Sequence, residues 1–423
     1  QLKHRWINRP LSRIISSQPP PWLLPDLDRW IGNRLYCFQE SHNNQIASVA
    51  FVSSQLARPL YHQKHWFSNL NSALQMVGQT DIVVVTSPRT TTYRFIQACA
   101  NEFNLRLSNT VICRTQKQWK KLITAEYSTD SNECIISPPQ SLPNLTRNPP
   151  NCIKAKPERD RFLIGGAQQV YVIEGRIGSK TQRLLKRREA QTIWMPKLPD
   201  PNISRPPACH PPPSITDTPY LLPKWFNPNA TLAHWTRAAD GPWPLQSESD
   251  WYLQLVHGWS EADHSALATL QNIVSKEVIY GSGRTIREGH KVVCLTRVPI
   301  SRWQELHIYR PHLRRWDFCP YGVVFSPTAI SRITPTDVQY GDEDLWKRLR
   351  PSDRPYFQAI DCNIDWTIEQ EQRVLGDIVL RSLQNDDLIL FTQTAWEAEQ
   401  LQIYSRWPIV PFDYLQRTDR IQT

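Results

Sequence analysis

Residues 365–374 read DWTIEQEQRV and place two acids two positions apart, with an arginine just beyond, in a segment that alternates like a β-strand. Along such a strand Glu369, Glu371 and Arg373 face one side of a sheet, and the two glutamines between them face the other. Two carboxylates presented together suit a site in which one holds a sugar hydroxyl while the other steadies an attacking group. A solvated, charged strand face is the alternative interpretation.

Composition predicts a globular, cytoplasmic protein of two domains. The chain has 423 residues, of which 40% are hydrophobic. No apolar run reaches the roughly 20 residues of a membrane helix, and the opening residues do not read as a secretory signal, so no membrane partner is expected. The nine cysteines are scattered without a Cys-x-x-Cys pair, which argues against a disulfide framework and against a bound metal.

The two halves of the chain carry opposite charge. Residues 1–195 hold 26 basic and 12 acidic residues, a net charge of +14, whereas residues 196–423 hold 23 and 27, a net charge of −4. The first half is therefore expected to attract phosphate groups, including those of nucleic acid.

The first half also has the rhythm of an α/β fold. We expect an N-terminal arm over residues 1–44, because this segment is too short for a core of its own, and then a domain over residues 45–195. Its near-continuous apolar strands alternate with helices, which predicts a parallel sheet covered on both faces. The expected strands are 46–52, 81–86, 110–113 and 170–173, the expected helices are 66–76 and 91–103, and a polar segment at about 128–157 is expected to be a loop.

Parallel sheets bind ligands at the carboxyl ends of their strands, so the residues there are candidates for holding a phosphate. They are Ser53, Arg58, Ser87, Arg89, Thr90, Arg176 and Lys180. The residues after Ser87 open a helix whose free N–H groups attract anions, although Ser87 and Thr90 are equally suited to cap that helix. The tetrad Gly-Ser-Lys-Thr at 178–181 lacks the spacing of a P-loop, which excludes that class of nucleoside triphosphatase.

The βα pattern, together with Gly165-Gly166-Ala167 and the strand-end Glu174, resembles Rossmann-like nucleotide-sensing domains. These are related to the DNA-processing and lysine-decarboxylase-like families, and they accompany effectors in bacterial defence proteins. The resemblance implies a nucleotide-derived ligand for residues 45–195. Residues 196–223 contain ten prolines and are expected to form a semi-rigid linker, with a mixed α+β domain over residues 224–423.

Five ordered motifs in the second domain resemble a family linked to abortive phage infection. They are His-x-Thr-Arg with Gly-Pro-Trp-Pro (234–244), Val-Val-Cys-Leu-Thr-Arg-Val-Pro (292–299), Tyr-Gly-Val-Val-Phe (321–325), Val-Gln-Tyr-Gly-Asp (338–342) and Asp-Trp-x-x-Glu-x-Glu-x-Arg (365–373). The order His234, Thr296, Glu371 also resembles the ADP-ribosyltransferase fold, in which three such side chains surround NAD.

The resemblance implies a role for each residue. His234 would bond the nicotinamide ribose and Thr296 would support the nicotinamide end. Glu371 would hold the ribose 2′-hydroxyl and stabilise the oxocarbenium-like state, while Glu369 would activate the acceptor. The remaining cofactor-binding candidates are Tyr280, with Arg237 or Arg284 for the pyrophosphate. Gln372 stands where members of the family carry tryptophan, so a hydrolytic or inactive version stays open.

We therefore predict a bacterial antiphage-defence effector, in which nucleotide sensing is coupled to an NAD-dependent ADP-ribosyltransferase or NAD-cleaving domain. A non-enzymatic nucleic-acid-binding or assembly protein with a degenerate transferase-like scaffold is the first alternative. Cleavage of an N-glycosidic bond by the first domain, with Glu174 as the acid, is the second. For His234 alone, a hydrogen-bonded histidine within a core strand is the favoured interpretation, and only the ordered set of motifs supports the site.

Overall fold

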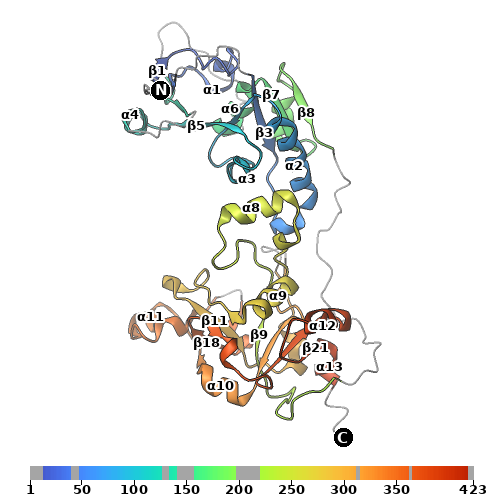
Figure 1. Cartoon of the computed structure of the whole chain (residues 1–423). Helices are drawn as coiled ribbons and strands as arrows, with labels where there is room; N and C mark the ends of the chain where they lie inside the picture. The colour runs from blue at the N-terminus through green and yellow to red at the C-terminus, as the bar shows by residue number, and fades with distance from the viewer. Residues whose placement is uncertain are drawn as a thin grey trace, which may run out of the picture. The chain divides into compact units, whose positions relative to one another are not determined.

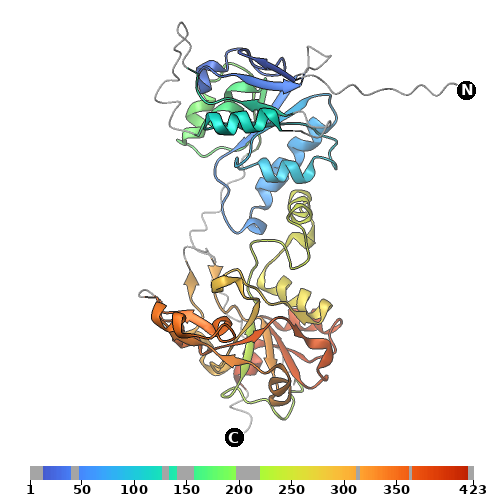
Figure 2. The same cartoon turned by 90° about the vertical axis from the view of Figure 1, so that its left-hand side faces the viewer.

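The computed structural model describes residues 13–39, 47–125, 133–140, 157–196, 220–310, 315–361 and 364–417 (Figures 1 and 2). They form two compact units, each of mixed α/β structure. The first unit comprises the described residues of 1–201 together with 246–262, and the second comprises those of 202–245 and 263–423. Most of the predicted linker, residues 197–219, lies outside the described residues.

The first unit is built on one eight-stranded sheet in the order β1-β2-β6-β5-β4-β3-β7-β8. Its strands are β1 (Arg13–Ser16), β2 (Tyr36–Gln39), β3 (Ser48–Ser53), β4 (Val83–Thr86), β5 (Arg106–Ile112), β6 (Cys134–Ile136), β7 (Gln169–Glu174) and β8 (Thr192–Trp194). The strands from β6 to β8 in this order run parallel, as predicted, whereas β1 and β2 are antiparallel to their neighbours. The chain leaves β3 towards β4 and later returns to its other side with β7, so the switch point of the sheet lies between β3 and β7.

Two predictions about this unit are wrong. The described part of the predicted arm is no arm, because β1 and β2 extend the sheet and Trp22 and Trp30 are buried in its core. The predicted loop at 128–157 contains β6, a three-residue strand of buried side chains. Both errors have one cause, since a strand of three or four residues is too short for its period to stand out.

Helices cover both faces of this sheet, including one from the far side of the predicted linker. They are α1 (Asp28–Ile31), α2 (Lys64–Gly78), α3 (Tyr93–Cys99), α4 (Gln116–Thr124), α6 (Glu158–Gly166), α7 (Lys180–Leu185) and α8 (Glu248–His257). Helix α8 was expected in the second domain. Instead, its buried residues join the core around α2 and α3, and the Tyr252 ring meets the Phe95 ring at 4.9 Å.

The second unit has a seven-stranded sheet in the order β15-β18-β11-β9-β14-β20-β21. The strands are β9 (Leu232–Trp235), β11 (Val292–Thr296), β14 (Gly322–Phe325), β15 (Thr336–Asp337), β18 (Glu371–Leu375), β20 (Leu388–Thr392) and β21 (Ile409–Pro411). Neighbours are antiparallel except β20 and β21. The sheet has a hydrophobic cluster on each side, which explains why its central strands are apolar throughout.

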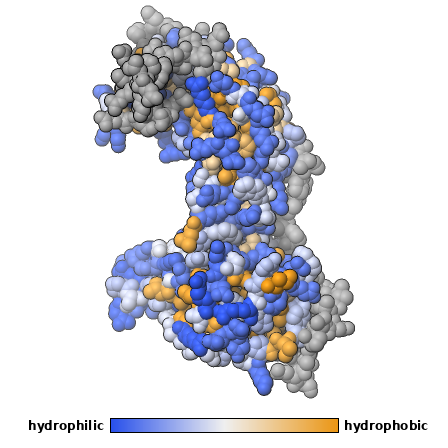
Figure 3. All heavy atoms as spheres, viewed as in Figure 1, coloured by the Kyte–Doolittle hydropathy of each residue, from blue (hydrophilic) through white to orange (hydrophobic). Residues whose placement is uncertain are grey.

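Helices and short strand pairs complete the second unit. The helices are α9 (Ala266–Lys276), α10 (Pro327–Ile333), α11 (Glu343–Arg348), α12 (Ala395–Gln402) and α13 (Phe412–Arg417), and the short pairs are β10 (Val278–Ile279) with β19 (Ile378–Val379), β12 (Tyr309–Arg310) with β13 (Arg315–Trp316), and β16 (Gln339–Gly341) with β17 (Phe357–Ala359). None of the helices in the described ranges is long and apolar enough to cross a membrane. The face drawn in Figure 3 is mainly hydrophilic, with hydrophobic residues in small separate groups.

Candidate active site

Three neighbouring strands carry the three residues that the sequence singled out. His234 is on β9, Thr296 ends β11, and Glu371 begins β18, and these strands are adjacent in the sheet. Thr296 is the direct partner of Glu371 on one side and of Ala233 on the other. Paired residues share a face of the sheet, so Thr296 and Glu371 lie together, whereas the register turns His234 towards the face of Leu295.

The His234 ring contacts the backbone of the neighbouring strand β11. Its Nδ1 lies 2.9 Å from the carbonyl oxygen of Cys294 on β11. A carbonyl only accepts, so Nδ1 must donate, and Nε2 of the neutral ring is left as an acceptor. Burial lowers the pKa of His234 to about 4, and the charge of Arg237 acts in the same direction. The ring is therefore neutral at pH 7.

Glu371 is held by an arginine on its own strand. Arg373 donates from Nε and Nη2 to the two carboxylate oxygens of Glu371, at 2.9 and 3.0 Å, and its side chain is only 1% exposed. Its remaining donors go to the carbonyls of Pro355 and Phe357 and to Gln358 Oε1. This bidentate pair fixes the plane of the Glu371 carboxylate. The predicted common face of Glu371 and Arg373 is confirmed.

Glu369 is not on that strand, which corrects the prediction that both acids alternate along it. Residues Trp366–Glu369 form a 3₁₀ turn, and Gln370 follows with φ 45° and ψ 51°, so the strand begins only at Glu371. The Thr296 hydroxyl donates to the Glu369 carbonyl and accepts from the backbone N–H of Val298. Thr296 thus ties the turn to β11.

The Glu369 carboxyl lies in a field of mixed charge. Burial, followed by the negative charges of Glu371 and Asp317, raises its pKa to about 7, while Arg237 and Arg310 oppose this shift. A carboxyl that titrates near 7 can accept or return a proton at neutral pH. Because Arg237 acts on both His234 and Glu369, these two residues belong to one electrostatic neighbourhood.

Two members of this neighbourhood were not predicted. Arg310 on β12 and Asp317 after β13 form an ion pair at 2.9 Å, with side chains that are 13% and 14% exposed. Their pairing comes from the β12–β13 hairpin, and no motif in the sequence signals it. The contacts described for two predicted cofactor-binding residues do not involve His234, Thr296 or Glu371. Tyr280 follows β10, and its ring centre lies 5.9 Å from the Lys291 ammonium group. Arg284 is exposed and lies beside Gly241.

The predicted phosphate-binding residues of the first unit gather at the carboxyl edge of its parallel sheet. Ser53 ends β3, Ser87 follows β4, and Arg176 follows β7. Arg176 donates its backbone N–H to Ser54 Oγ at 3.0 Å, and its guanidinium donates to the Gln55 carbonyl. The exposed side chains at this edge include Arg58, Arg89, Arg176 and Lys180.

Other features of this edge have structural roles. Thr90 closes a turn onto the Ser87 carbonyl, and the helix predicted to open at Thr91 begins at Tyr93 as the seven-residue α3. The glycines of the 165–167 motif lie in α6, where a Cβ on Gly165 would collide with the Trp30 ring. That motif therefore packs α6 against Trp30. Among the described residues no group of His, Cys, Asp or Glu could hold a metal ion.

Comparisons with known proteins give no family. No protein-family model and no curated protein matches the chain. DNA processing protein A from Streptococcus pneumoniae is similar over 44% of this chain and 64% of its own, less than two thirds of its length, with 15% identity and a TM-score of 0.27. Carboxyl esterase 2 from Tuber melanosporum is similar over 46% and 78%, with 11% identity and a TM-score of 0.12. At TM-scores this low, neither structure shows the fold of this chain.

Proposed function

We propose that the second unit binds NAD and breaks the bond between nicotinamide and ribose, as a transferase or a hydrolase with an ADP-ribosyltransferase-like fold. The observation that supports this proposal is the adjacency of β9, β11 and β18, which puts Thr296 and Glu371 side by side on one face of the sheet. Glu369 lies in the turn before β18, and His234 lies on the opposite face of the sheet, with its ring hydrogen-bonded to β11. The first unit, as a Rossmann-like domain, would bind a nucleotide-derived signal at its sheet edge, and the whole would act in bacterial defence.

In this mechanism the carboxylate fixed by Arg373 has the central role. Glu371 accepts a hydrogen bond from the ribose 2′-hydroxyl and faces the positive charge that develops on the ribose as the C1′–N bond breaks. The bonding electrons leave with nicotinamide. Glu369 then takes a proton from the acceptor or from water as that nucleophile bonds to C1′. The positively charged Arg237 suits the pyrophosphate. His234, on the other face of the sheet, holds β9 to β11 through the Cys294 carbonyl.

The test is nicotinamide release from labelled NAD. Glu371→Gln should lower the rate at least a hundredfold, because removal of one such electrostatic group costs a few kcal/mol of barrier. Glu399→Gln, an exposed acid on α12, should leave the rate unchanged. Thermal melts must show that Glu371→Gln still folds, since Arg373 loses its charged partner. Absence of nicotinamide release from the wild-type chain, with nucleotide ligands present, would reject the proposal.

The same assay distinguishes this reaction from a glycosidic cleavage in the first unit. If Glu174 were the acid of a glycosidic cleavage, Glu174→Gln would abolish activity and Glu371→Gln would not. Glu174 ends β7 and lies 4.0 Å from Arg176, so its side chain is placed at the sheet edge.

A second function, nucleic-acid binding by the first unit, is favoured by one observation. The net charge of +14 over residues 1–195 coincides with exposed arginine and lysine at the carboxyl edge of the sheet. Binding of single-stranded DNA or RNA should then weaken steeply with salt. Arg176→Ala combined with Lys180→Ala should lower the salt slope, and an unchanged slope would contradict binding at this edge.

A further inference from the structure

A tyrosine completes the backbone hydrogen bonds of Glu371 at the edge of the second unit's sheet. The Glu371 carbonyl accepts from the N–H of Val338 at 3.0 Å, just beyond the two paired residues of β15. The chain then leaves the sheet to form β16, which contains Tyr340. The hydroxyl oxygen of Tyr340 accepts from the N–H of Glu371 at 3.2 Å. Tyr340 therefore provides the acceptor that a neighbouring strand would otherwise provide.

Tyr340 and the Glu371 side chain are on the same side of the sheet. Strand β16 pairs with β17, where the Phe357 carbonyl and the Gln358 side chain both accept from Arg373. Arg373 also holds the Glu371 carboxylate. The short β16–β17 pair thus packs on the face of the sheet from which that carboxylate projects.

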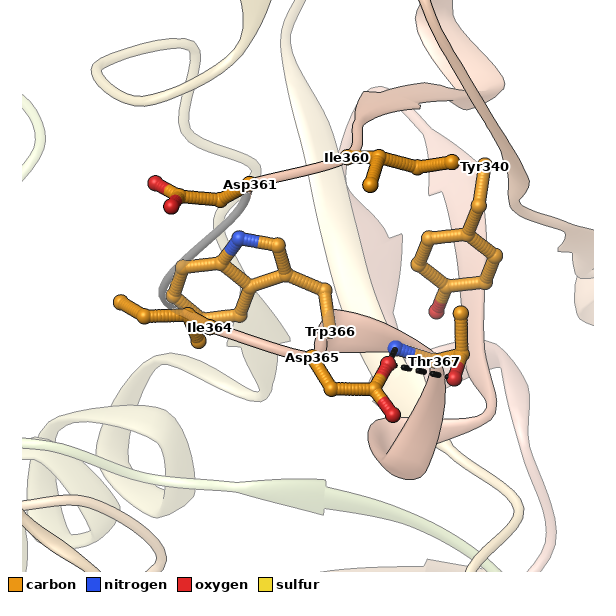
Figure 4. A pocket seen from close by; sticks show the side chains of 7 residues that line it. All are labelled: Tyr340, Ile360, Asp361, Ile364, Asp365, Trp366 and Thr367. Carbon is orange, nitrogen blue, oxygen red and sulfur yellow. Dashed lines mark hydrogen bonds between the residues drawn. The ribbon is translucent and has the colours of Figure 1, made fainter.

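The hydroxyl group of Tyr340 has a proton to donate. A phenol both accepts and donates, and here its oxygen accepts from the N–H of Glu371. No residue in the described part of the chain accepts the proton, and Figure 4 shows the hydroxyl pointing towards the turn that carries Thr367. Burial, together with the negative charges of Glu371 and Glu369, raises the pKa of Tyr340, so the hydroxyl keeps its proton at neutral pH.

The carboxylate of Glu371 is an acceptor with positions left over. Arg373 uses one position on each oxygen, and a carboxylate offers about four. The Glu371 side chain is 11% exposed, so a ligand can reach the remaining positions. A donor beside an acceptor matches a hydroxyl group of a ligand, because a hydroxyl accepts one hydrogen bond and donates another. A group that can only donate or only accept would leave one of the two unused.

We propose that Tyr340 donates a hydrogen bond to the same ribose 2′-hydroxyl that donates to Glu371, and that this pair makes the site selective for ribose over 2′-deoxyribose. The inference rests on the proposed binding of NAD and adds a second contact to the ribose, from a strand outside the seven-stranded sheet. A hydroxyl held through both its oxygen and its proton fixes the sugar for cleavage of the C1′–N bond.

Titration calorimetry of the whole chain measures this contact without a reaction. The ligands are ADP-ribose and the analogue that lacks the 2′-hydroxyl of the terminal ribose. The wild type should prefer ADP-ribose by about tenfold or more, because the analogue forms neither hydrogen bond. Tyr340→Phe should lower the affinity for ADP-ribose about fivefold and leave the affinity for the analogue within about twofold. Tyr404→Phe, at a residue that is 77% exposed, should change neither affinity.

The comparison of the two ligands separates recognition from support of the strand. If Tyr340 only holds the N–H of Glu371, Tyr340→Phe weakens the binding of both ligands equally, and an unchanged preference for ADP-ribose would overturn the proposal. If Tyr340→Phe does not fold, Tyr340→3-fluorotyrosine replaces it, because fluorine makes the hydroxyl a stronger donor and a weaker acceptor. The preference for ADP-ribose should then rise, and an equal or smaller preference would reject the contact.

Nicotinamide release, measured in parallel, distinguishes this inference from the proposed function. Release by the wild type, with an unchanged ligand preference in Tyr340→Phe, rejects the role of Tyr340 alone. Binding of ADP-ribose that depends on Tyr340, without release of nicotinamide from NAD, rejects NAD cleavage alone. Absence of both binding and release rejects both.

Discussion

At the scale of single residues, the two acids of DWTIEQEQRV have become chemically different. Glu371 is fixed by Arg373 in a bidentate ion pair, whereas burial and neighbouring acids raise the pKa of Glu369. The sequence predicted two acids on one strand face. It could not predict this difference, because it depends on the left-handed conformation at Gln370 and on Asp317 from a distant hairpin.

The raised pKa of Glu369 predicts a pH-dependent cost in stability. The folded state holds the proton to about pH 7, against an ordinary value of 4.5, so the contribution of Glu369 to stability is lost as pH rises from about 4.5 to about 7. Glu369→Gln should therefore raise the free energy of unfolding at pH 8 by about 1–2 kcal/mol and leave it nearly unchanged at pH 4.

Urea unfolding at both pH values measures this difference. Glu399→Gln, on the exposed face of α12, should change the free energy of unfolding relative to the wild type by the same small amount at both pH values. Parallel pH curves for the wild type and Glu369→Gln would contradict the raised pKa. If Glu369 is also the base of the reaction, the ascending limb of the pH–rate profile near 7 should disappear in the same variant.

At the scale of elements, the predicted strands and helices of the first domain are largely confirmed, because apolar runs mark them. Helix α8 begins after Ser247, whose hydroxyl accepts from Asp250 N–H, and ends at Gly258 with φ 70°. Short strands such as β6 inside the first sheet and β15 at the edge of the second are too short to carry such a mark. The site depends on such details, since the turn before β18 is set by a hydroxyl on another strand.

Loss of that hydroxyl should loosen the turn. Thr296→Val keeps the shape of the buried side chain but leaves the Glu369 carbonyl and the Val298 N–H without their partner, so we expect a loss of about 1–3 kcal/mol. Thr328→Val, at an exposed position in α10, should change stability by less than about 0.5 kcal/mol. Equal stabilities of the two variants in chemical denaturation would show that the tie contributes nothing.

Alanine substitutions at the two glycines of α6 test whether Gly165 is needed for packing against Trp30, with Gly166 as the control. Gly165→Ala forces a methyl group into the Trp30 ring and should destabilise the chain by about 1–3 kcal/mol. Gly166→Ala meets the end of the Leu27 side chain at 3.3 Å and the Phe162 ring at 3.5 Å, and the better helix propensity of alanine offsets these contacts, so the stability of this variant should match the wild type. Equal or reversed melting temperatures of the two variants would contradict this packing role of Gly165.

At the scale of the whole molecule, the domain boundary read from composition is incomplete. Ten prolines mark residues 196–223, but the first unit also includes residues 246–262, which follow β9 of the second unit. Composition locates a linker from its lack of core residues, but it cannot show that a later amphipathic helix packs in an earlier core. That assignment needs the tertiary contacts of Trp251, Tyr252 and Leu255.

The discontinuous first unit predicts how fragments behave. Fragment 1–201 lacks α8 and would expose the apolar surface around Phe95 that Tyr252 and Leu255 cover, so it should aggregate or melt without cooperativity. Adding a synthetic peptide of residues 246–262 should restore a cooperative melt. A fragment 1–201 that unfolds cooperatively by itself, at the temperature of the whole chain, would contradict this role of α8.

Helix α8 also fixes an order of events during synthesis. Translation runs from the N-terminus, and the carbonyl of Val256 accepts a hydrogen bond from the side-chain amide of Asn71, a residue made 185 positions earlier. All strands of the first unit's sheet therefore leave the ribosome before α8 does. The apolar surface that α8 covers around α2 and α3 stays exposed while β9 of the other unit is made. During that interval a chaperone that recognises apolar surface has a defined target on the nascent chain.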